Sequence, residues 1–134
     1  VTGLTLDAKS VVWESDYSPY AYISPDRTIT SEDGKVRTAV EIKALDSPKV
    51  LEIWKTGDIP EEYIPQIVKY FTVNDDLEVL YWVVGTDLIP GLEIQIFRIP
   101  RSDVEDKIEE LKAFEIGVLS MLEKDAEAIE SIPY

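Results

Sequence analysis

Two acidic residues and a lysine in the first third of the chain are of the types that cleave phosphodiester bonds. Asp26 follows Ser24 and Pro25, and the segment Glu41, Ile42, Lys43 comes fifteen to seventeen positions later. Two neighbouring carboxylates bind a divalent cation, which activates water and neutralises charge on a phosphate. A lysine beside them adds a fixed positive charge. The trio predicts metal-dependent phosphodiester hydrolysis, provided that the three side chains meet in space.

A β-hairpin has to bring the two acids together. The Asp33–Gly34 dipeptide predicts a two-residue turn with positive φ at both positions, with Glu32 facing Lys35. In that register Asp26 lies directly opposite Glu41. Facing residues have Cβ atoms about 4.5–5.5 Å apart, so two such carboxylates need a cation or a shared proton between them.

Side chains alternate along a strand, so Glu41 and Lys43 are predicted to share one face of the sheet. The other face carries Val40, Ile42 and Ala44, and this apolar face can be buried.

The composition narrows the possible chemistry. The 134 residues are enough for one domain with a single core, and the chain has neither cysteine nor histidine. Thiol catalysis, histidine triads and imidazole zinc sites are thereby excluded. No apolar run reaches the ~20 residues of a membrane span, and no secretory leader is visible. The first residue is not methionine, and we expect residues 1–134 to be a single domain within a longer chain.

The charge is large, negative and uneven. A net charge of −14 argues against broad nonspecific binding of nucleic acid. Six basic residues nevertheless fall between positions 35 and 69, and three of them are predicted on the face of Glu41: Lys35, Arg37 and Lys43. They form either a basic strip that contacts DNA or ordinary solvated surface.

The hydrophobic pattern predicts an α/β (or α+β) fold, with a central mixed sheet of about five strands flanked by helices. The expected elements are a strand over 10–14, hairpin strands over 20–30 and 36–45, a break at 47–48, a helical turn or strand over 49–55, a short turn over 60–64 and a helix over 65–72. Two apolar strands follow over 77–85 and 92–99, joined at 90–91, and a long amphipathic helix begins at Ser102 or Asp103.

The order of these residues resembles a known family. Ser24-Pro25-Asp26, Glu41-Ile42-Lys43, Trp54 and the segment 59–66 (Ile-Pro-Glu-Glu-Tyr-Ile-Pro-Gln), followed by two apolar strands, is similar to the phage lambda-type exonucleases. These are also called YqaJ-like viral recombinases and belong to the PD-(D/E)XK nucleases. The segment 66–70 also resembles the Gln-xxx-Tyr element of RecB-like nucleases. The resemblance covers about residues 10–115 and implies a restriction-endonuclease-like core.

The resemblance implies a role for each matched residue. Asp26, Glu41 and the carbonyl of Ile42 would bind Mg²⁺, with Mn²⁺ as a substitute. Lys43 would orient or activate the attacking water. Two further roles are implied for residues of the segment 63–70: Gln66 would hold the lysine or the water, and Tyr63 or Tyr70 would support the scissile phosphate.

The resemblance also implies substrate and partners. The expected activity is a Mg²⁺-dependent exonuclease that acts on double-stranded DNA ends in the bacterial cytoplasm and leaves single strands for recombination. A single-strand annealing protein and a ring-shaped trimer are the implied partners. The chain departs from the family where Arg27 follows Asp26 in place of glycine, and where an N-terminal helix with a glutamate is not seen. A noncatalytic DNA-end or protein-binding module, or an endonuclease with the same site, are the alternatives.

Overall fold

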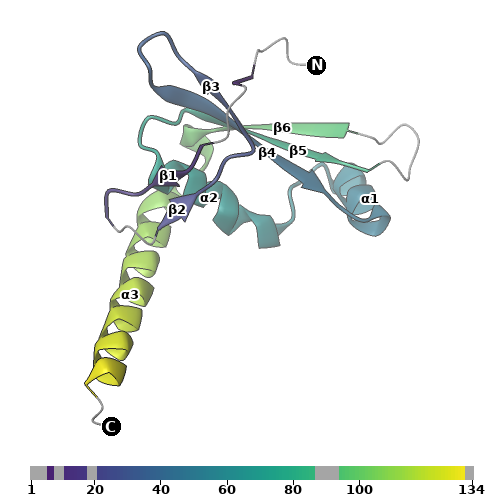
Figure 1. Ribbon diagram of the computed structural model, residues 1–134. Coiled ribbons are helices and arrows are strands. Elements are labelled where there is room, and N and C mark those ends of the chain that lie inside the picture. The colour runs from purple at the N-terminus through teal and green to yellow at the C-terminus, as the bar shows by residue number, and fades with distance from the viewer. Residues whose placement is uncertain (1–5, 8–10, 18–20, 87–93, 132–134) are drawn as a thin grey trace.

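The computed structural model describes residues 6–7, 11–17, 21–86 and 94–131, which form a mixed α/β fold (Figure 1). Its elements in chain order are β1 (Trp13–Glu14), β2 (Tyr22–Ile23), β3 (Arg27–Thr30), β4 (Val36–Ala44), α1 (Ser47–Thr56), the 3-10 helix η1 (Glu61–Tyr63), α2 (Ile64–Val73), β5 (Val79–Gly85), β6 (Ile94–Pro100), the 3-10 helix η2 (Arg101–Asp103) and α3 (Glu105–Glu130).

The main sheet is mixed, as the sequence predicts. Its four strands lie in the order β3-β4-β5-β6, with β4 and β5 parallel and the other neighbours antiparallel. Strands β1 and β2 form a separate two-stranded sheet. The antiparallel pairing predicted for the two late strands is confirmed as β5 and β6, whereas their predicted connection at 90–91 lies outside the described residues. No helix in the described ranges is long and apolar enough to cross a bilayer.

The segment predicted as one strand over 20–30 is two strands. β2 ends at Ile23 and pairs with β1, while β3 begins at Arg27 and pairs with β4. Pro25 lies between them and has no N–H to donate to a ladder. This break directs the chain from the small sheet into the main one and leaves Asp26 at the junction.

The hairpin between β3 and β4 has a longer turn than predicted. The Ser31 N–H donates to the Lys35 carbonyl (2.8 Å), so the loop has three residues between them. Only Gly34 in the loop has positive φ, at 82°. The expected two-residue turn is therefore wrong, because Asp33 stays at negative φ and Gly34 alone supplies the left-handed position.

A β-bulge then restores the predicted register. Thr30 pairs with Val36 and Ile29 with Thr38, which leaves Arg37 as the extra residue of β4. The bulge cancels the one-residue difference in the turn. The rest of the hairpin keeps the pairing predicted from the sequence.

Helix α1 begins where the sequence suggested a break. The Asp46 carboxylate accepts from the backbone N–H of Lys49 at 3.1 Å, and Pro48 sits in the first turn, where its missing N–H costs nothing. Gly57, at φ 72°, ends the helix. The short turn and following helix predicted over 60–72 are confirmed as η1 and α2.

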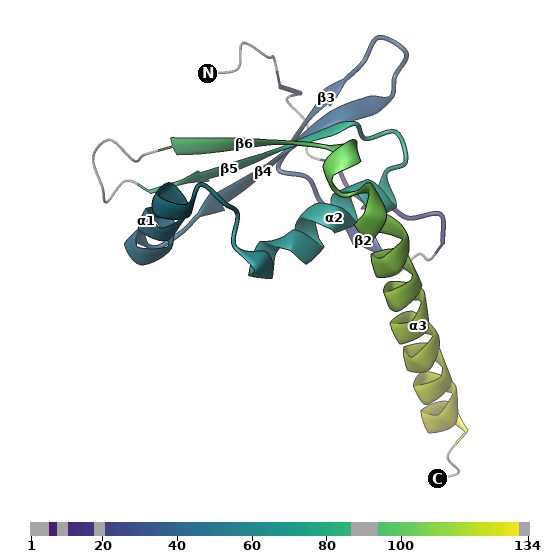
Figure 2. The ribbon, with the colours of Figure 1, turned by 180° about the vertical axis from the view of Figure 1, so that it is seen from behind.

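All three helices lie on one side of the main sheet (Figures 1 and 2). The core forms on that side, where Ile67, Phe71, Leu80 and Trp82 are fully buried or nearly so. On the opposite face of β4, Val40 is buried, whereas Ile42 is 53% exposed. The face of Glu41 is the one that α2 covers.

Helix α3 packs on the body only at its start. Val104 and Ile108 are buried, but Val118, Leu122 and Ile129, which follow further along the chain, are 39%, 57% and 64% exposed. The second half of the helix projects away from the domain (Figure 2). Neither Ser102 nor Asp103 caps it, because both belong to η2.

Arg101 joins the end of α2 to the start of α3. Its guanidinium donates to the carbonyls of Leu77, Phe71 and Asn74 at 2.8–3.1 Å. These acceptors include carbonyls at the C-terminal end of α2, which have no partner within the helix. The arginine thus closes one end of the core under the sheet.

Replacement of Arg101 by methionine should lower the free energy of unfolding by about 3 kcal/mol, because several charge-assisted hydrogen bonds are lost while the carbonyls stay partly buried. Urea denaturation measures this. Arg98→Met is the matched control, since Arg98 is exposed on β6. Equal midpoints for the two variants would contradict the assigned role.

Candidate active site

The predicted site residues converge between β4 and α2. Glu41 and Lys43 are two positions apart on β4, so both side chains lie on the face that α2 covers. Gln66 and Tyr70 are four residues apart on α2 and therefore lie on one face of that helix. A spacing of two on the strand and of four on the helix places each pair on one face, and the two faces pack against each other.

Glu41 is the centre of this group and is only 6% exposed. Its Oε1 accepts from Gln66 Nε2 at 3.1 Å and lies 3.3 Å from Lys43 Nζ. Its Oε2 accepts from the Tyr70 hydroxyl. A carboxylate is costly to bury unless it is paired and hydrogen-bonded, and here both oxygens have partners.

Tyr70 is fully buried. Burial raises the pKa of its hydroxyl well above the ordinary value, and the hydrogen bond to Glu41 raises it further. The hydroxyl therefore keeps its proton and remains a donor to Glu41. The Trp13 ring packs against Tyr70 in a T-shaped arrangement, with centroids 6.0 Å apart, and helps to hold the phenol in place.

Asp26 reaches the same group through the backbone. Its Oδ2 accepts from the N–H of Ile42 at 2.7 Å. Ile42 is the residue between Glu41 and Lys43, so this bond holds the first acid at the segment that carries the second acid and the lysine. The negative charge of Asp26 also raises the pKa of Tyr70, by less than burial or Glu41 does, while a hydrogen bond with the Asp26 backbone lowers it.

Tyr63 forms an aromatic wall beside the lysine. Its ring packs against the buried Trp82, with centroids 5.4 Å apart. Lys43 Nζ lies 5.8 Å from the centre of the same ring. The Tyr63 hydroxyl accepts from Lys49 Nζ at 3.4 Å. Of the two tyrosines predicted to support a phosphate, Tyr63 is the one that is partly exposed.

Lys49 was not singled out for the site from the sequence, because the segment 49–55 was ambiguous between helix and strand. The signal that would have placed it is the capping pattern of Asp46 followed by Pro48. That pattern starts α1 directly after β4, and so turns Lys49 back toward Tyr63.

The other predicted cations are engaged elsewhere. Lys35 lies 3.5 Å from Asp76, and Arg37 binds Asp33 beside the hairpin turn. Lys69 lies 3.5 Å from Glu115 of α3. These pairs are surface contacts with nearby acids, as in the solvated-surface interpretation of the basic strip. Trp54, which belongs to the family resemblance, is 49% exposed on α1.

The donor set fits a hard divalent cation. Asp26 and Glu41 offer carboxylate oxygens, Ile42 offers a peptide oxygen, and Mg²⁺ and Mn²⁺ prefer such ligands. Across the described ranges, no three acidic side chains gather at one point. The two carboxylates would therefore share an ion with the peptide oxygen and with water, which Mg²⁺ retains readily.

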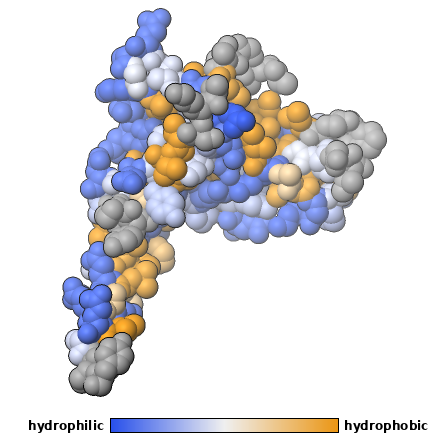
Figure 3. All heavy atoms as spheres, viewed as in Figure 1, coloured by the Kyte–Doolittle hydropathy of each residue, from blue (hydrophilic) through white to orange (hydrophobic). Residues whose placement is uncertain are grey.

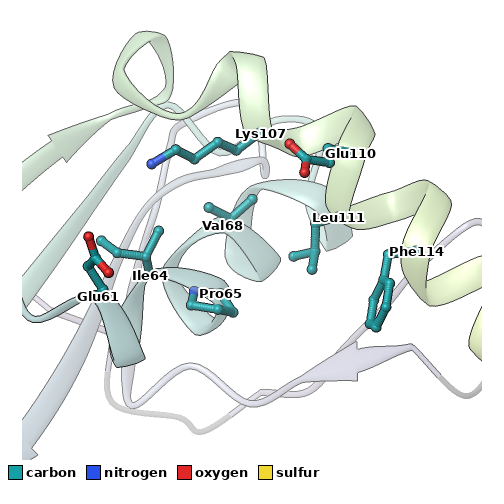
Figure 4. Close-up of a pocket in the computed structure, with 8 residues that line it drawn as sticks. All are labelled: Glu61, Ile64, Pro65, Val68, Lys107, Glu110, Leu111 and Phe114. Carbon is teal, nitrogen blue, oxygen red and sulfur yellow. The ribbon is translucent and has the colours of Figure 1, made fainter.

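An apolar groove lies apart from these residues, between α2 and α3 (Figure 4). Its volume is about 530 Å³, and Ile64, Val68, Leu111 and Phe114 are among the residues that line it. None of the predicted site residues borders it. Its lining is suited to packing against another apolar surface rather than to acid–base chemistry.

Comparison with known proteins identifies relatives. The YqaJ-like viral recombinase domain family matches residues 1–76. The fold is similar to the crystal structure of LHK-Exo, an alkaline exonuclease from Laribacter hongkongensis, with 21% identity, a TM-score of 0.55 and coverage of 90% of this chain. The same enzyme in complex with dAMP gives a TM-score of 0.56 at 21% identity and 90% coverage. The chain spans 64% of the length of that exonuclease. The comparison with curated proteins gave no match.

Substitution of Tyr70 by phenylalanine removes one hydrogen bond from the buried Glu41 carboxylate. We expect a loss of about 2 kcal/mol in the free energy of unfolding, the usual size for a bond to a charged group. Urea denaturation at neutral pH measures it. Tyr81→Phe makes the same chemical change at a β5 position next to Trp82 and should cost much less. An unchanged stability for Tyr70→Phe would show that the hydroxyl does not support Glu41.

Proposed function

This chain belongs to the YqaJ-like viral recombinase domain family, and we propose that it is a metal-dependent DNA exonuclease. In this proposal it hydrolyses phosphodiester bonds at double-stranded ends and leaves single strands for recombination. The likeness of its fold to an alkaline exonuclease is consistent with this activity.

The observation that carries the proposal is the environment of Glu41. The Glu41 carboxylate is buried, with Lys43 at 3.3 Å and donors on both oxygens. Such a group adds little to the stability of the fold, because the cost of desolvating the charges offsets much of their attraction. Groups held in this way are typical of sites where a carboxylate has to stay in one orientation. The neighbouring Asp26 supplies the second acid that a cation site needs.

The residues take distinct roles in the proposed reaction. Asp26, Glu41 and the Ile42 carbonyl would hold Mg²⁺ or Mn²⁺, and the ion would supply activation of water and neutralisation of charge on the phosphate. Lys43 orients the attacking water and faces the phosphate. Gln66 and Tyr70 fix the two Glu41 oxygens.

Tyr63 supports the phosphate next to Lys43. Its ring is held on the buried Trp82, so it offers a rigid side to the site. Its hydroxyl is already placed among cations, because it accepts from Lys49. A phenol in this position can donate to a phosphate oxygen, while the two lysines balance the negative charge of the phosphate.

We also propose that the protein assembles into a ring and works with a single-strand annealing protein in the bacterial cytoplasm. The exposed apolar side chains on the second half of α3, visible as orange patches on the projecting helix (Figure 3), support contact with another protein surface. An acidic exterior would also keep DNA from binding outside the site.

Replacement of Lys43 by alanine should reduce cleavage at least ~10²-fold, because a preorganised positive charge beside the reacting phosphate is lost. A gel assay of the full-length protein on end-labelled linear and closed circular duplexes measures this, with Mg²⁺ and with a chelator. We expect the wild type to degrade the linear duplex and not the circular one, and to do so only when Mg²⁺ is present. Nicking of circles would indicate an endonuclease, and DNA binding without cleavage would indicate a noncatalytic module.

Replacement of Asp26 or Glu41 by alanine should weaken Mg²⁺ binding as well as cleavage, since each removes a charged ligand. Titration calorimetry with Mg²⁺ in the absence of DNA separates the two effects. Lys43→Ala is the matched variant and should bind the ion at least as well as the wild type. Unchanged Mg²⁺ affinity in both acid variants would contradict the assigned ligands.

A further inference from the structure

A second lysine stands beside the proposed catalytic lysine. Lys49 comes from α1, outside the Glu41–Lys43 segment, yet its Nζ lies 5.6 Å from the centre of the Tyr63 ring. Lys43 Nζ lies 5.8 Å from the same centre. Two ammonium groups therefore lie near one aromatic ring in a chain whose net charge is −14.

The position of Lys49 is fixed by the fold. Its backbone N–H donates to the capping Asp46 at 3.1 Å, and the fully buried Val50 and Ile53 anchor α1 against the core. On the other side, the Tyr63 ring rests on Trp82. The ammonium is therefore held next to the site by a rigid helix start and a rigid ring.

The two lysines differ in their acidic partners. Lys43 is paired with the buried Glu41, and this ion pair holds the Lys43 ammonium within the proposed site. Lys49 is paired with Glu62 at 3.1 Å, and the side chains of this pair are 41% and 56% exposed. Hydrogen bonds to Glu62 and to Tyr63 raise the pKa of Lys49, so it stays charged. An exposed pair of this kind contributes little stability and is exchanged at low cost.

We propose that Lys49 binds a backbone phosphate of the DNA next to the phosphate faced by Lys43, and that Glu62 holds this lysine until DNA replaces it. The inference rests on the proposed nuclease function. It assigns to α1 a contact with substrate that does not depend on the metal. Glu62 then lowers affinity, because DNA has to displace it.

The test compares DNA binding by Lys49→Gln and Lys55→Gln in the full chain. Both residues lie on α1 and both changes remove one positive charge. With an end-labelled duplex and no divalent ion, the slope of log K against log salt should be smaller by about 0.9 for Lys49→Gln, the value for one lost phosphate contact. Lys55→Gln should keep the wild-type slope.

A double-mutant cycle tests the role of Glu62. Glu62→Gln should tighten DNA binding, and this gain should disappear when Lys49 is also replaced by glutamine. Glu61→Gln is the control, because it removes a neighbouring acid of the same 3-10 helix. If Glu62→Gln still tightens DNA binding when Lys49 is replaced, the effect comes from the lost negative charge alone. That result would overturn the proposed exchange of Glu62 for a phosphate at Lys49.

The outcomes separate this inference from the proposed function. Cleavage by the wild type with equal salt slopes for Lys49→Gln and Lys55→Gln overturns the role of Lys49 and leaves the nuclease proposal intact. A wild type that neither binds nor cleaves the duplex overturns both. In a cleavage assay, Lys49→Gln should raise KM with little change in kcat, unlike Lys43→Ala.

Discussion

The structure of this domain depends most on the burial of one carboxylate. Glu41 is 6% exposed on a central strand, where an acid is tolerated only if its partners are present. Those partners come from α2, because Gln66 and Tyr70 are one helical turn apart and bind different oxygens of the same group. The packing of α2 on the sheet and the chemistry of the site are therefore one arrangement. Whatever moves the helix away from β4 removes the hydrogen bonds that make Glu41 tolerable.

The same arrangement explains how an acidic chain can act on a polyanion. Cations at the hairpin and on α2 are paired with neighbouring acids, as Arg37 with Asp33 and Lys69 with Glu115. Lys43 and Lys49 both lie near the Tyr63 ring, and the proposed exchange of Glu62 for a phosphate would make the charge of Lys49 available there. Binding is then determined by access to a small site and by one or two phosphate contacts, rather than by general attraction to the surface.

Much of this arrangement follows from the sequence. The predicted register of the hairpin is correct between Arg27 and Ile29, but only because a bulge in β4 offsets the extra residue of the loop. The three-residue loop and the compensating bulge at Arg37 were not predictable, since they depend on which residue accepts positive φ in competition with the ladder. Alternation alone does not show which face of β4 a helix covers, and tertiary packing places α2 over Glu41 while Ile42 on the other face stays exposed. The binding of metal to Asp26, Glu41 and Ile42 stays a prediction.

The proposed cation site is tested by an anomalous difference map from crystals soaked in Mn²⁺. If these residues bind the ion, the map has one strong peak at the Asp26 and Glu41 carboxylates and the Ile42 carbonyl, at oxygen distances of about 2.0–2.2 Å. Gln66 and Tyr70 remain hydrogen-bonded to Glu41 in that state. A map with no peak between these residues, at Mn²⁺ concentrations that support cleavage, would show that they do not bind the ion.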